Sequence, residues 1–442
     1  MHIANTPSRQ YPDTWYARTR DNQPIRPSLN APHQSRICVV GGGLAGLSVA
    51  YELRRHGMPV TILEAGRLAW GASGRNGGFV SPGFSTGFSE IVERIGFDLA
   101  VRLYQYSRLG AQRVRENIDN LAPHCLMGEG KFSVSRYPAA SEMRAQAELL
   151  SQKLGDNVEY LSTRQLRDFV RSARYFDGIH KPDGFHIHPL NYALALAAEV
   201  ESLGGRIFED SKAVSIEPGS PVDKGGRWKV KTAHGTVNCE QVVVCTSGYD
   251  AGFYKPVSRS VLPVATHVAV TEPLDAGLLD LINTRGCISD TGNACDYFRL
   301  IDDNRLLWGG KITTVKAPPG SLDRKMHRAM VDVFPELSRI KIENSWSGLM
   351  GYCRHKMPVI QKYKPGIWVS TAFGGHGLNT TAMAGELVAT AIAGDDQRWK
   401  DFSSYNLEWN GGWIGRAFVQ GSYWQMRAKD SIAEYRGRRS GD

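Results

Sequence analysis

The feature that most constrains this chain is a glycine-rich hexapeptide, Gly-Gly-Gly-Leu-Ala-Gly at residues 41–46, directly after the apolar run Ile37-Cys38-Val39-Val40. It matches the pattern G-x-G-x-x-G, which joins a buried strand to a helix. The first glycine allows a tight turn, the second lets backbone N–H groups approach a pyrophosphate, and the third lets the helix pack on the strand. The residues predicted to bind a dinucleotide here are Gly41, Gly43, Leu44, Ala45 and Gly46.

A helix and a second strand follow this turn. Apolar residues recur at helical spacing between Leu44 and His56, and Val60-Thr61-Ile62-Leu63 is again a short apolar run. Glu64 ends that strand 18 residues after Gly46, where a carboxylate accepts hydrogen bonds from ribose hydroxyls and repels a 2′-phosphate. The unit therefore predicts FAD or NAD, bound with Glu64 and Ala65, and disfavours NADP.

Two further glycine-rich segments favour FAD over NAD. Residues 71–78 offer many backbone N–H donors, which suit a diphosphate or the polar edge of a flavin ring. Residues 374–381 lie between a predicted strand and a predicted helix, so their N–H groups and the helix dipole would stabilise the negative charge of a reduced flavin. The residues predicted to contact FAD in these segments are Ser73, Gly74, Arg75, Asn76, Gly77 and Gly78, then Gly374, Gly375, His376, Gly377 and Leu378.

Length and composition set further bounds. With 442 residues, 42% of them hydrophobic and 22% charged, the chain has a globular composition and the length of two domains. Its net charge of +9 is scattered, without a basic cluster interleaved with aromatic residues, so nucleic acid is not an expected partner. The N-terminus lacks the apolar core of a signal peptide, and no apolar run approaches the length of a membrane span. We expect a cytoplasmic protein.

Metal binding is not predicted. The seven cysteines form no C-x-x-C pair, which argues against a zinc ribbon, and their odd number argues against a disulfide framework. His186-Ile187-His188 is an H-x-H pattern, but no third ligand is evident and Pro189 opens a helix beside it.

Strands of the dinucleotide type recur near the beginning, middle and end of the chain. This pattern predicts an α/β fold in which a discontinuous Rossmann-type domain receives an inserted α+β domain built on a mixed sheet. The expected FAD-binding domain comprises residues 36–98, 189–260 and 340–398, and the expected substrate domain comprises residues 99–188 and 261–339. Proline-rich residues 1–35 are predicted to form an extended arm on the surface, and residues 399–442 a C-terminal extension.

Helical periodicity is clearest in four segments outside the first turn. The helices predicted from it span residues 99–118, 139–154, 189–203 and 380–393.

These segments resemble the D-amino-acid oxidase superfamily of flavoproteins, and within it the gamma-glutamylputrescine oxidase-like group. The likeness lies in residues 39–48, 63–65, 71–78 and 374–377, with weaker matches at residues 15–17, 297–300, 346–348 and 357–360. Together these segments run over most of the chain.

The resemblance implies a flavin held between a discontinuous FAD domain and a substrate domain. It also implies that the backbone of Val214 contacts the adenine. Relatives with a covalent flavin use a histidine or cysteine that Ser73-Gly74-Arg75 lacks, so the resemblance implies non-covalent FAD.

The activity implied by the resemblance is oxidation of the carbon–nitrogen bond of an amine or amino acid. Hydride passes to flavin N5, and water hydrolyses the resulting imine to an aldehyde or keto acid. The implied substrate is a gamma-glutamylated polyamine or another omega-amino compound, and molecular oxygen is the expected acceptor. No oligomeric state is predicted.

Three residues are candidates for contact with the substrate. Arg299 offers a planar fork for a carboxylate, and Tyr297, two residues earlier on the same strand face, could donate its hydroxyl to the same ligand. His376 could polarise the flavin or orient the substrate. The alternatives are a solvated arginine, a packed tyrosine and a histidine bonded to backbone. Lys311 and Lys356 are candidates for a positive charge that assists the reduction of oxygen.

Three other functions stay open. The nearest is a dehydrogenase that passes electrons to a quinone or a carrier protein. A flavin-binding subunit without turnover of its own is the second. An RNA-modifying flavoprotein is the third, and the absence of a basic, aromatic-rich cluster argues against it.

Overall fold

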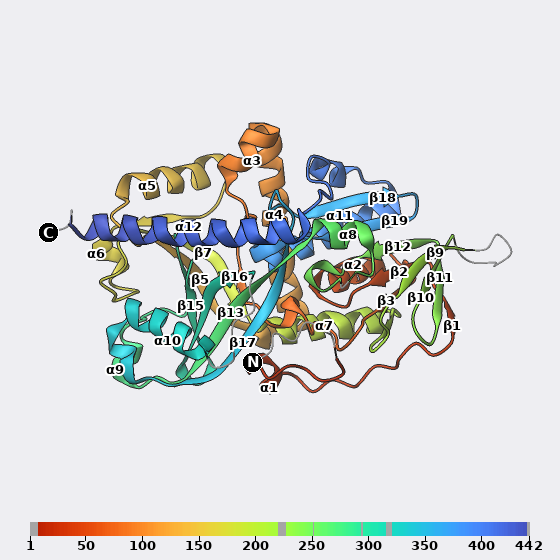
Figure 1. The fold of residues 1–442 in the computed structure, drawn as a ribbon, viewed down its shortest axis with the longest axis horizontal. Coiled ribbons are helices and arrows are strands. Elements are labelled where there is room, and N and C mark those ends of the chain that lie inside the picture. The colour runs from red at the N-terminus through yellow and green to blue at the C-terminus, as the bar shows by residue number, and fades with distance from the viewer. Residues whose placement is uncertain (1–7, 220–226, 251, 293–294, 315–320, 440–442) are drawn as a thin grey trace.

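The computed structural model describes residues 8–219, 227–250, 252–292, 295–314 and 321–439. Two large sheets lie side by side, a six-stranded sheet toward one end of the molecule and a nine-stranded sheet toward the other (Figure 1). Helices α4 (Phe97–Leu121) and α11 (Gly377–Gly394) pack against each other. This architecture confirms the predicted α/β fold class, with strands from distant parts of the chain in one sheet.

The six-stranded sheet is parallel apart from one edge strand. Its neighbours β19, β12, β2, β3 and β8 run parallel, and β18 pairs antiparallel with β19. In order across the sheet, the strands are β18 (Val359–Lys364), β19 (Ile367–Thr371), β12 (Gln241–Val244), β2 (Ile37–Val40), β3 (Val60–Leu63) and β8 (Arg206–Phe208). Because the carboxyl ends of parallel strands meet at one edge, the segments that follow β2, β3, β12 and β19 are brought together there.

The predicted strand–turn–helix–strand unit is confirmed. Helix α2 (Leu44–Arg55) follows β2 and leads into β3, and its buried side packs against α11 and α7 (Pro189–Ser202). Strands β2 and β3 are buried over their whole length, as expected for parallel strands covered on both faces. The strand predicted just before residue 374 corresponds to β19, and the helix predicted over residues 380–393 corresponds to α11.

The nine-stranded sheet is mixed and holds its own apolar core. Phe298 stacks on Trp308 with ring centroids 4.5 Å apart, and Phe334 meets both rings edge-on. In order, its strands are β17 (Ile342–Tyr352), β13 (Leu262–Pro273), β16 (Arg305–Thr313), β15 (Tyr297–Ile301), β14 (Cys287–Asp290), β5 (Leu126–Val134), β7 (Gly178–Ile187) and β4 (Phe79–Val80), with β6 (Glu159–Leu161) paired to β7. Helix α10 (Ser321–Val333) contacts β13, β16 and β17.

A third, four-stranded sheet borders the six-stranded one. It contains the predicted hairpin, β10 (Trp228–Lys231) with β11 (Thr236–Cys239), flanked by β1 (Pro32–Gln34) and β9 (Ser215–Pro218). The remaining helices are α1 (Trp15–Arg18), α3 (Phe88–Ile95), α5 (Ala140–Glu148), α6 (Thr163–Leu166), α8 (Lys255–Ser260), α9 (Ala276–Leu279) and α12 (Gly412–Arg439).

The N-terminal arm differs from its prediction. Part of it is extended, but the short helix α1 inserts into the protein: Trp15 is 7% exposed and Tyr16 is fully buried. Thr14 caps this helix by accepting the N–H of Ala17 at 3.0 Å. Two large aromatic side chains drive the burial, so the surface placement of residues 1–35 was wrong for this turn.

The expected domain limits stay a prediction, but sheet membership bears on them. Strand β17 begins the third segment assigned to the FAD domain, and β4 lies in the first, yet both strands belong to the nine-stranded sheet. The segments therefore cross between sheets at residues 79–80 and 342–352. The C-terminal extension contains the 28-residue helix α12.

Candidate active site

A cavity of about 570 Å³ lies at the carboxyl edge of the six-stranded sheet, between the two large sheets. It is lined by parts of all three glycine-rich segments and by the side of the nine-stranded sheet that faces them. The predicted cofactor residues on its wall are Gly41, Gly43, Leu44, Ala45, Glu64, Ala65, Ser73, Arg75, Asn76, Gly77, Gly78, Gly374, Gly375, His376, Gly377 and Leu378. Segments more than 300 residues apart thus meet at one site.

The first turn shows why glycine is needed there. Gly41 has a φ of +110°, and a Cβ on it would lie 2.9 Å from the carbonyl oxygen of Cys245. A Cβ on Gly46 would lie 1.9 Å from the carbonyl oxygen of Gly41, so α2 reaches its position against β2 only without a side chain. Gly46 thus supports the turn from behind and does not line the cavity.

Glu64 stands at the cavity wall after β3. One of its carboxylate oxygens accepts the N–H of Gly42 at 2.7 Å, and the other accepts the N–H of Gly66 at 2.9 Å. Burial raises the pKa of this carboxyl, and hydrogen bonds from the backbone of Gly66, Gly42 and Ala65 act in the opposite direction. Since a carboxylate has about four acceptor sites, acceptor capacity remains for ribose hydroxyls.

The second segment, residues 71–78, folds over the cavity as a held loop. Ser73 Oγ accepts the N–H of Leu44 at 2.9 Å and so joins the loop to the start of α2. Asn76 donates to the carbonyl of Ser73 at 2.8 Å and accepts the N–H of Gly78 at 2.8 Å. Gly74 turns away from the cavity, since a Cβ on it would lie 2.5 Å from the carbonyl oxygen of Ala69.

Arg75 is held in the wall of this loop. Its guanidinium carbon lies 4.1 Å from the ring centroid of Trp70, and its Nε donates to the carbonyl of Trp70 at 2.8 Å. One terminal nitrogen, Nη1, donates to the carbonyl of Ser347 at 3.2 Å, and the other has no partner among the described residues. The arginine therefore joins the loop to β17 and leaves one donor group for a ligand.

The third turn lies between β19 and α11. Gly375 donates its N–H to Ser85 Oγ at 2.7 Å, and His376 and Gly377 follow on the cavity wall at the N-terminus of α11. Burial, together with the charges of Lys131 and Lys181, lowers the pKa of His376 to about 3. His376 is therefore a neutral imidazole at physiological pH. A negative charge on a ligand at this turn would be stabilised by the positive N-terminal end of α11 and not by the histidine.

The nine-stranded sheet forms another wall of the cavity, with both polar and apolar residues. Tyr297 is packed against the loop, because a Cβ on Gly77 would lie 2.6 Å from its ring. The residues of this wall include Thr266, Ser289, Asp290, Tyr297, Ile312, Met350 and Tyr352.

Lys131 is a cavity residue that the sequence interpretation missed. It lies on β5, and its Nζ donates to Ser81 Oγ at 2.7 Å. Among the described residues no carboxylate lies within ion-pair distance of it, and burial lowers its pKa. The only sequence signal was a lysine within Gly-Lys-Phe-Ser-Val, whose alternation marks an inward-facing strand.

Arg299 does not have the place expected of a carboxylate ligand. Its side chain is fully buried and does not line the cavity. The guanidinium donates to the hydroxyl of Tyr16 at 2.9 Å and to the carbonyl of Ile187 at 3.0 Å, and it also bonds His186 Nδ1. The substrate role predicted for Arg299 was wrong, because its donors tie α1 to the nine-stranded sheet.

Val214 also differs from its prediction. Its N–H donates to the carbonyl of Lys231 at 2.8 Å, its side chain is 54% exposed, and the cavity wall is formed instead by Lys212 and Ala213. The residues on the cavity wall thus precede the predicted contact residue, Val214, by one and two positions.

The two lysines proposed for oxygen chemistry lie elsewhere. Lys311 pairs with Asp296, its Nζ 3.3 Å from the carboxylate, and Lys356 is exposed to solvent. Neither lines the cavity. Two lysines do line it, Lys212, which is exposed, and Lys131, which is partly buried and donates to Ser81.

The H-x-H pattern has structural partners. His186 bonds the carbonyl of Arg285 and the side chain of Arg299, and His188 caps α7 by accepting the N–H of Asn191 at 3.1 Å. Over the described part of the chain, no group of three or more His, Cys, Asp or Glu residues could hold a metal ion.

Comparison with known proteins identifies the family to which this site belongs. A family model described as FAD dependent oxidoreductase matches residues 36–391. The chain is 31% identical to a probable oxidoreductase, OrdL, of Haemophilus influenzae, over 92% of this chain and 94% of that protein. This chain belongs to the FAD-dependent oxidoreductase family.

Other relatives and solved structures agree with this assignment. The chain is also 31% identical to gamma-glutamylputrescine oxidoreductase of Escherichia coli, over 89% of this chain and 92% of that protein. The fold is that of L-amino acid deaminase from Proteus vulgaris (TM-score 0.69, 19% identity, 87% of this chain and 99% of that one). Glycine oxidase from Bacillus cereus has the same fold (TM-score 0.67, 19% identity, 85% and 99%).

Membership of this family confirms FAD as the cofactor, and the residues on the cavity wall fit it. Three turns present backbone donors, the glycines leave space that side chains would fill, and Glu64 keeps free acceptor sites for a ribose. Among the described residues, no helix is both long and apolar enough to cross a membrane.

Proposed function

We propose that this enzyme uses non-covalently bound FAD to oxidise the carbon–nitrogen bond of an amine or amino acid. The observation that carries the proposal is the convergence of three glycine-rich turns on one cavity that the nine-stranded sheet also lines. The names of the relatives support it, since gamma-glutamylputrescine oxidoreductase, glycine oxidase and L-amino acid deaminase all act on amines or amino acids by name.

When FAD is bound, it accepts a hydride from the carbon beside nitrogen, and the resulting imine is hydrolysed. The protein has to orient the substrate and exclude water. Tyr297, Thr266 and His376, whose imidazole is neutral, line the same cavity, and the proposal assigns to them the hydrogen bonds that fix the amine. A strong protein base is not needed, because the substrate carbon loses a hydride and not a proton.

Molecular oxygen is the proposed electron acceptor, and Lys131 supports this choice. Negative charge develops on oxygen as it takes up electrons, and a fixed cation stabilises that charge best where water is excluded. Lys131 is such a cation: it is enclosed, it lines the cavity, and a serine hydroxyl holds it in place.

Non-covalent attachment is supported by the state of the cavity thiols. Cys245 and Cys295 both line the cavity, and burial raises the pKa of each, that of Cys295 to about 12. Thiols that stay protonated are poor nucleophiles.

A gamma-glutamylated polyamine or another omega-amino compound is the proposed substrate. The support is the identity to gamma-glutamylputrescine oxidoreductase over most of both chains. The cation at Lys131 and the polar hydroxyls of the cavity are compatible with a substrate that carries charge at both ends.

The test is to measure oxygen consumption and hydrogen peroxide together, with purified holoenzyme and gamma-glutamylputrescine. The proposal expects equal amounts of both. Reduction of a quinone dye without oxygen uptake would identify a dehydrogenase, and bound FAD that no amine or amino acid reduces would identify a subunit without turnover. Release of FAD on denaturation tests the non-covalent attachment separately.

A further inference from the structure

Helix α12 (Gly412–Arg439) carries its bulky apolar side chains on the side that faces away from the protein. Trp413, Phe418 and Trp424 are 80%, 75% and 64% exposed, and Ile414 and Ile432 are also exposed. At about 100° per residue, all five fall within an arc of about 140°. We call this arc the outer face of α12. Trp413, at one edge of the arc, also lines a pocket against the body of the enzyme.

The rest of the helix circumference attaches α12 to the enzyme. Gln420 is buried at the edge of the outer face, and its side-chain oxygen accepts the N–H of Thr314 at 2.9 Å next to the end of β16. Val419, Tyr423 and Met426 are partly buried on the side opposite the outer face. The helix therefore has apolar side chains on both sides, and the larger exposed ones meet solvent, unlike those of an ordinary surface helix.

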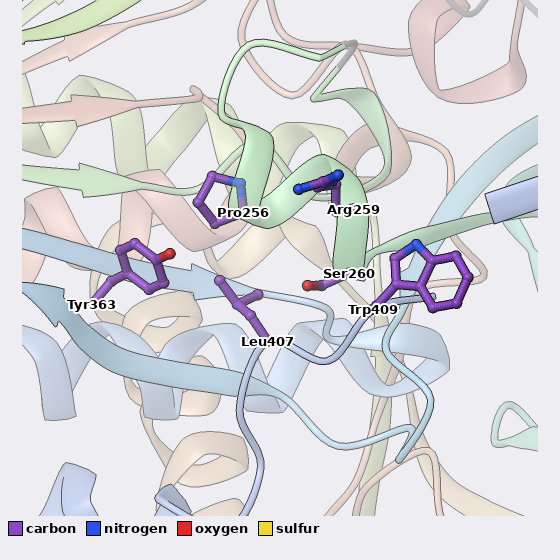
Figure 2. A pocket seen from close by; sticks show the side chains of 6 residues that line it. All are labelled: Pro256, Arg259, Ser260, Tyr363, Leu407 and Trp409. Atoms are coloured by element: carbon purple, nitrogen blue, oxygen red, sulfur yellow. The ribbon is translucent and has the colours of Figure 1, made fainter. Parts of the chain in front are cut away.

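The apolar surface continues beyond the helix. Trp409, 65% exposed, precedes α12 and lines a pocket of about 520 Å³ with Leu407, Tyr363 and Arg259. Figure 2 shows the indole of Trp409 on one side of this pocket and the Tyr363 ring on the other, with Arg259 on the rim. Arg259 is exposed, so its guanidinium is free to meet an anion.

The charge of α12 indicates what kind of partner could bind its outer face. Residues 412–439 contain six basic and two acidic residues, and the whole chain has a net charge of +9. Two copies of such a surface would repel each other, whereas an anionic surface would attract it. Exposed tryptophan and phenylalanine beside lysine and arginine are typical of helices that lie in a membrane interface.

We propose that the outer face of α12, with Trp409 and Arg259, docks the enzyme on the surface of an anionic lipid bilayer. The helix, about 42 Å long, lies along the bilayer surface without crossing it. The indole rings of Trp409, Trp413 and Trp424 enter the headgroup region. Arg259 and Lys429, which is exposed beside Phe418 on the helical wheel, meet lipid phosphates. Figure 1 shows α12 extended along the outside of the molecule, with its C-terminal end projecting beyond the other elements.

The test is sedimentation of the holoenzyme with vesicles. One set contains phosphatidylcholine alone, and in the other phosphatidylglycerol replaces about a third of the lipid, to give a negative surface potential. We expect binding to the anionic vesicles only. The triple variant Trp413→Ser, Phe418→Ser, Trp424→Ser keeps every charge and should bind more than about tenfold more weakly. Arg259→Gln with Lys429→Gln should weaken binding roughly thirtyfold.

Ile25→Ser is the matched control, because Ile25 is 80% exposed but lies on the N-terminal arm. It should bind like the wild type, and all variants should keep their FAD content and helical signal. The proposal is overturned if the wild type does not sediment with anionic vesicles. It is equally overturned if the triple variant binds anionic vesicles as well as the wild type does. A wild-type enzyme that is a dimer without affinity for lipid, and a triple variant that is a monomer, would show instead that the outer face joins two copies of the chain.

Discussion

At the scale of single residues, one acidic and one basic side chain on the cavity wall are available to ligands, Glu64 and Lys131. Glu64 accepts hydrogen bonds that fix the turns at Gly42 and Gly66 and keeps acceptor capacity for a ribose. Lys131 has one serine partner and is otherwise available to an anion. Each side chain is positioned by local structure and left partly unsatisfied, which is what a ligand site requires.

Replacing Glu64 should weaken the retention of FAD. Without the carboxylate, the ribose hydroxyls lose charge-assisted hydrogen bonds, and we expect the dissociation constant of FAD to rise about a hundredfold for Glu64→Ala while the protein still folds. Fluorescence titration with FAD and circular dichroism measure the two properties. Glu93→Ala, on the exposed side of α3, is the control. Unchanged FAD affinity in Glu64→Ala would contradict the ribose assignment.

Replacing Lys131 should slow the reaction with oxygen. We expect Lys131→Met to lower the rate of flavin reoxidation about a hundredfold, and to change anaerobic reduction by amine little, because the charge serves the oxygen step. Stopped-flow absorbance measures both half-reactions. Lys356→Met removes an exposed lysine and should leave both rates unchanged.

The same residue sets a pH dependence. Burial lowers the pKa of Lys131 below the ordinary value of 10.5, so the ammonium is present at low pH and is lost as pH rises through the lowered pKa. Reoxidation of the wild type should therefore slow in that range, and Lys131→Met should be slow at every pH. A pH profile that keeps its alkaline decline in the variant would exclude Lys131 as its cause.

The position of a site residue could be predicted from the sequence where a local pattern sets it. It could not be predicted where the packing of the sheet decides whether the side chain reaches the cavity. The glycines and Glu64 follow β2 and β3 directly, so their place at the sheet edge was readable from the sequence. Arg299 and Lys131 both lie on strands of the nine-stranded sheet, and only its pairing shows that one points behind the cavity wall and the other into it. No spacing rule contains that information.

At the scale of elements, α1 is attached to the enzyme by Arg299. The guanidinium joins the hydroxyl of Tyr16 to the carbonyl of Ile187, and the imidazole of His186 completes the group. This contact explains why an arm with many prolines has a buried turn.

Arg299→Ala should therefore act on stability. Buried polar groups would lose their partners, and we expect the free energy of unfolding to fall by about 3 kcal/mol or more, against about 1 kcal/mol for Tyr16→Phe. Thermal melting followed by circular dichroism measures the loss. KM should change alike for carboxylate-bearing and neutral amines. A rise in KM for carboxylates alone, at unchanged melting temperature, would restore Arg299 to the substrate site.

The junction of α2 with β2 gives a second element-level prediction. A methyl group on Gly46 would overlap the carbonyl oxygen of Gly41, so Gly46→Ala should push α2 away from the turn and reduce both FAD binding and stability. The control is Gly394→Ala at the end of α11, where a Cβ meets no atom within 4 Å. Equal FAD affinity in the two variants would show that close packing at Gly46 is not required.

At the scale of the whole molecule, the order of sheet strands along the chain builds the site. β2, β3, β12 and β19 belong to one sheet although they come from residues 37–40, 60–63, 241–244 and 367–371. The sequence revealed this discontinuity, because each of these strands is a short, mostly apolar run. It did not reveal that β4 and β17 join the second sheet, since sheet membership depends on partners distant in sequence.

The central claim is that the three turns together hold one FAD, and that an amine in the same cavity would reduce it. Anaerobic titration of the FAD-reconstituted enzyme with gamma-glutamylputrescine, followed by visible absorption, tests it most directly. The account predicts that the band of oxidised flavin bleaches in proportion to the amine added, and that oxygen restores it. Protein that takes up no FAD, or a flavin band unchanged by every amine and amino acid tried, would contradict it.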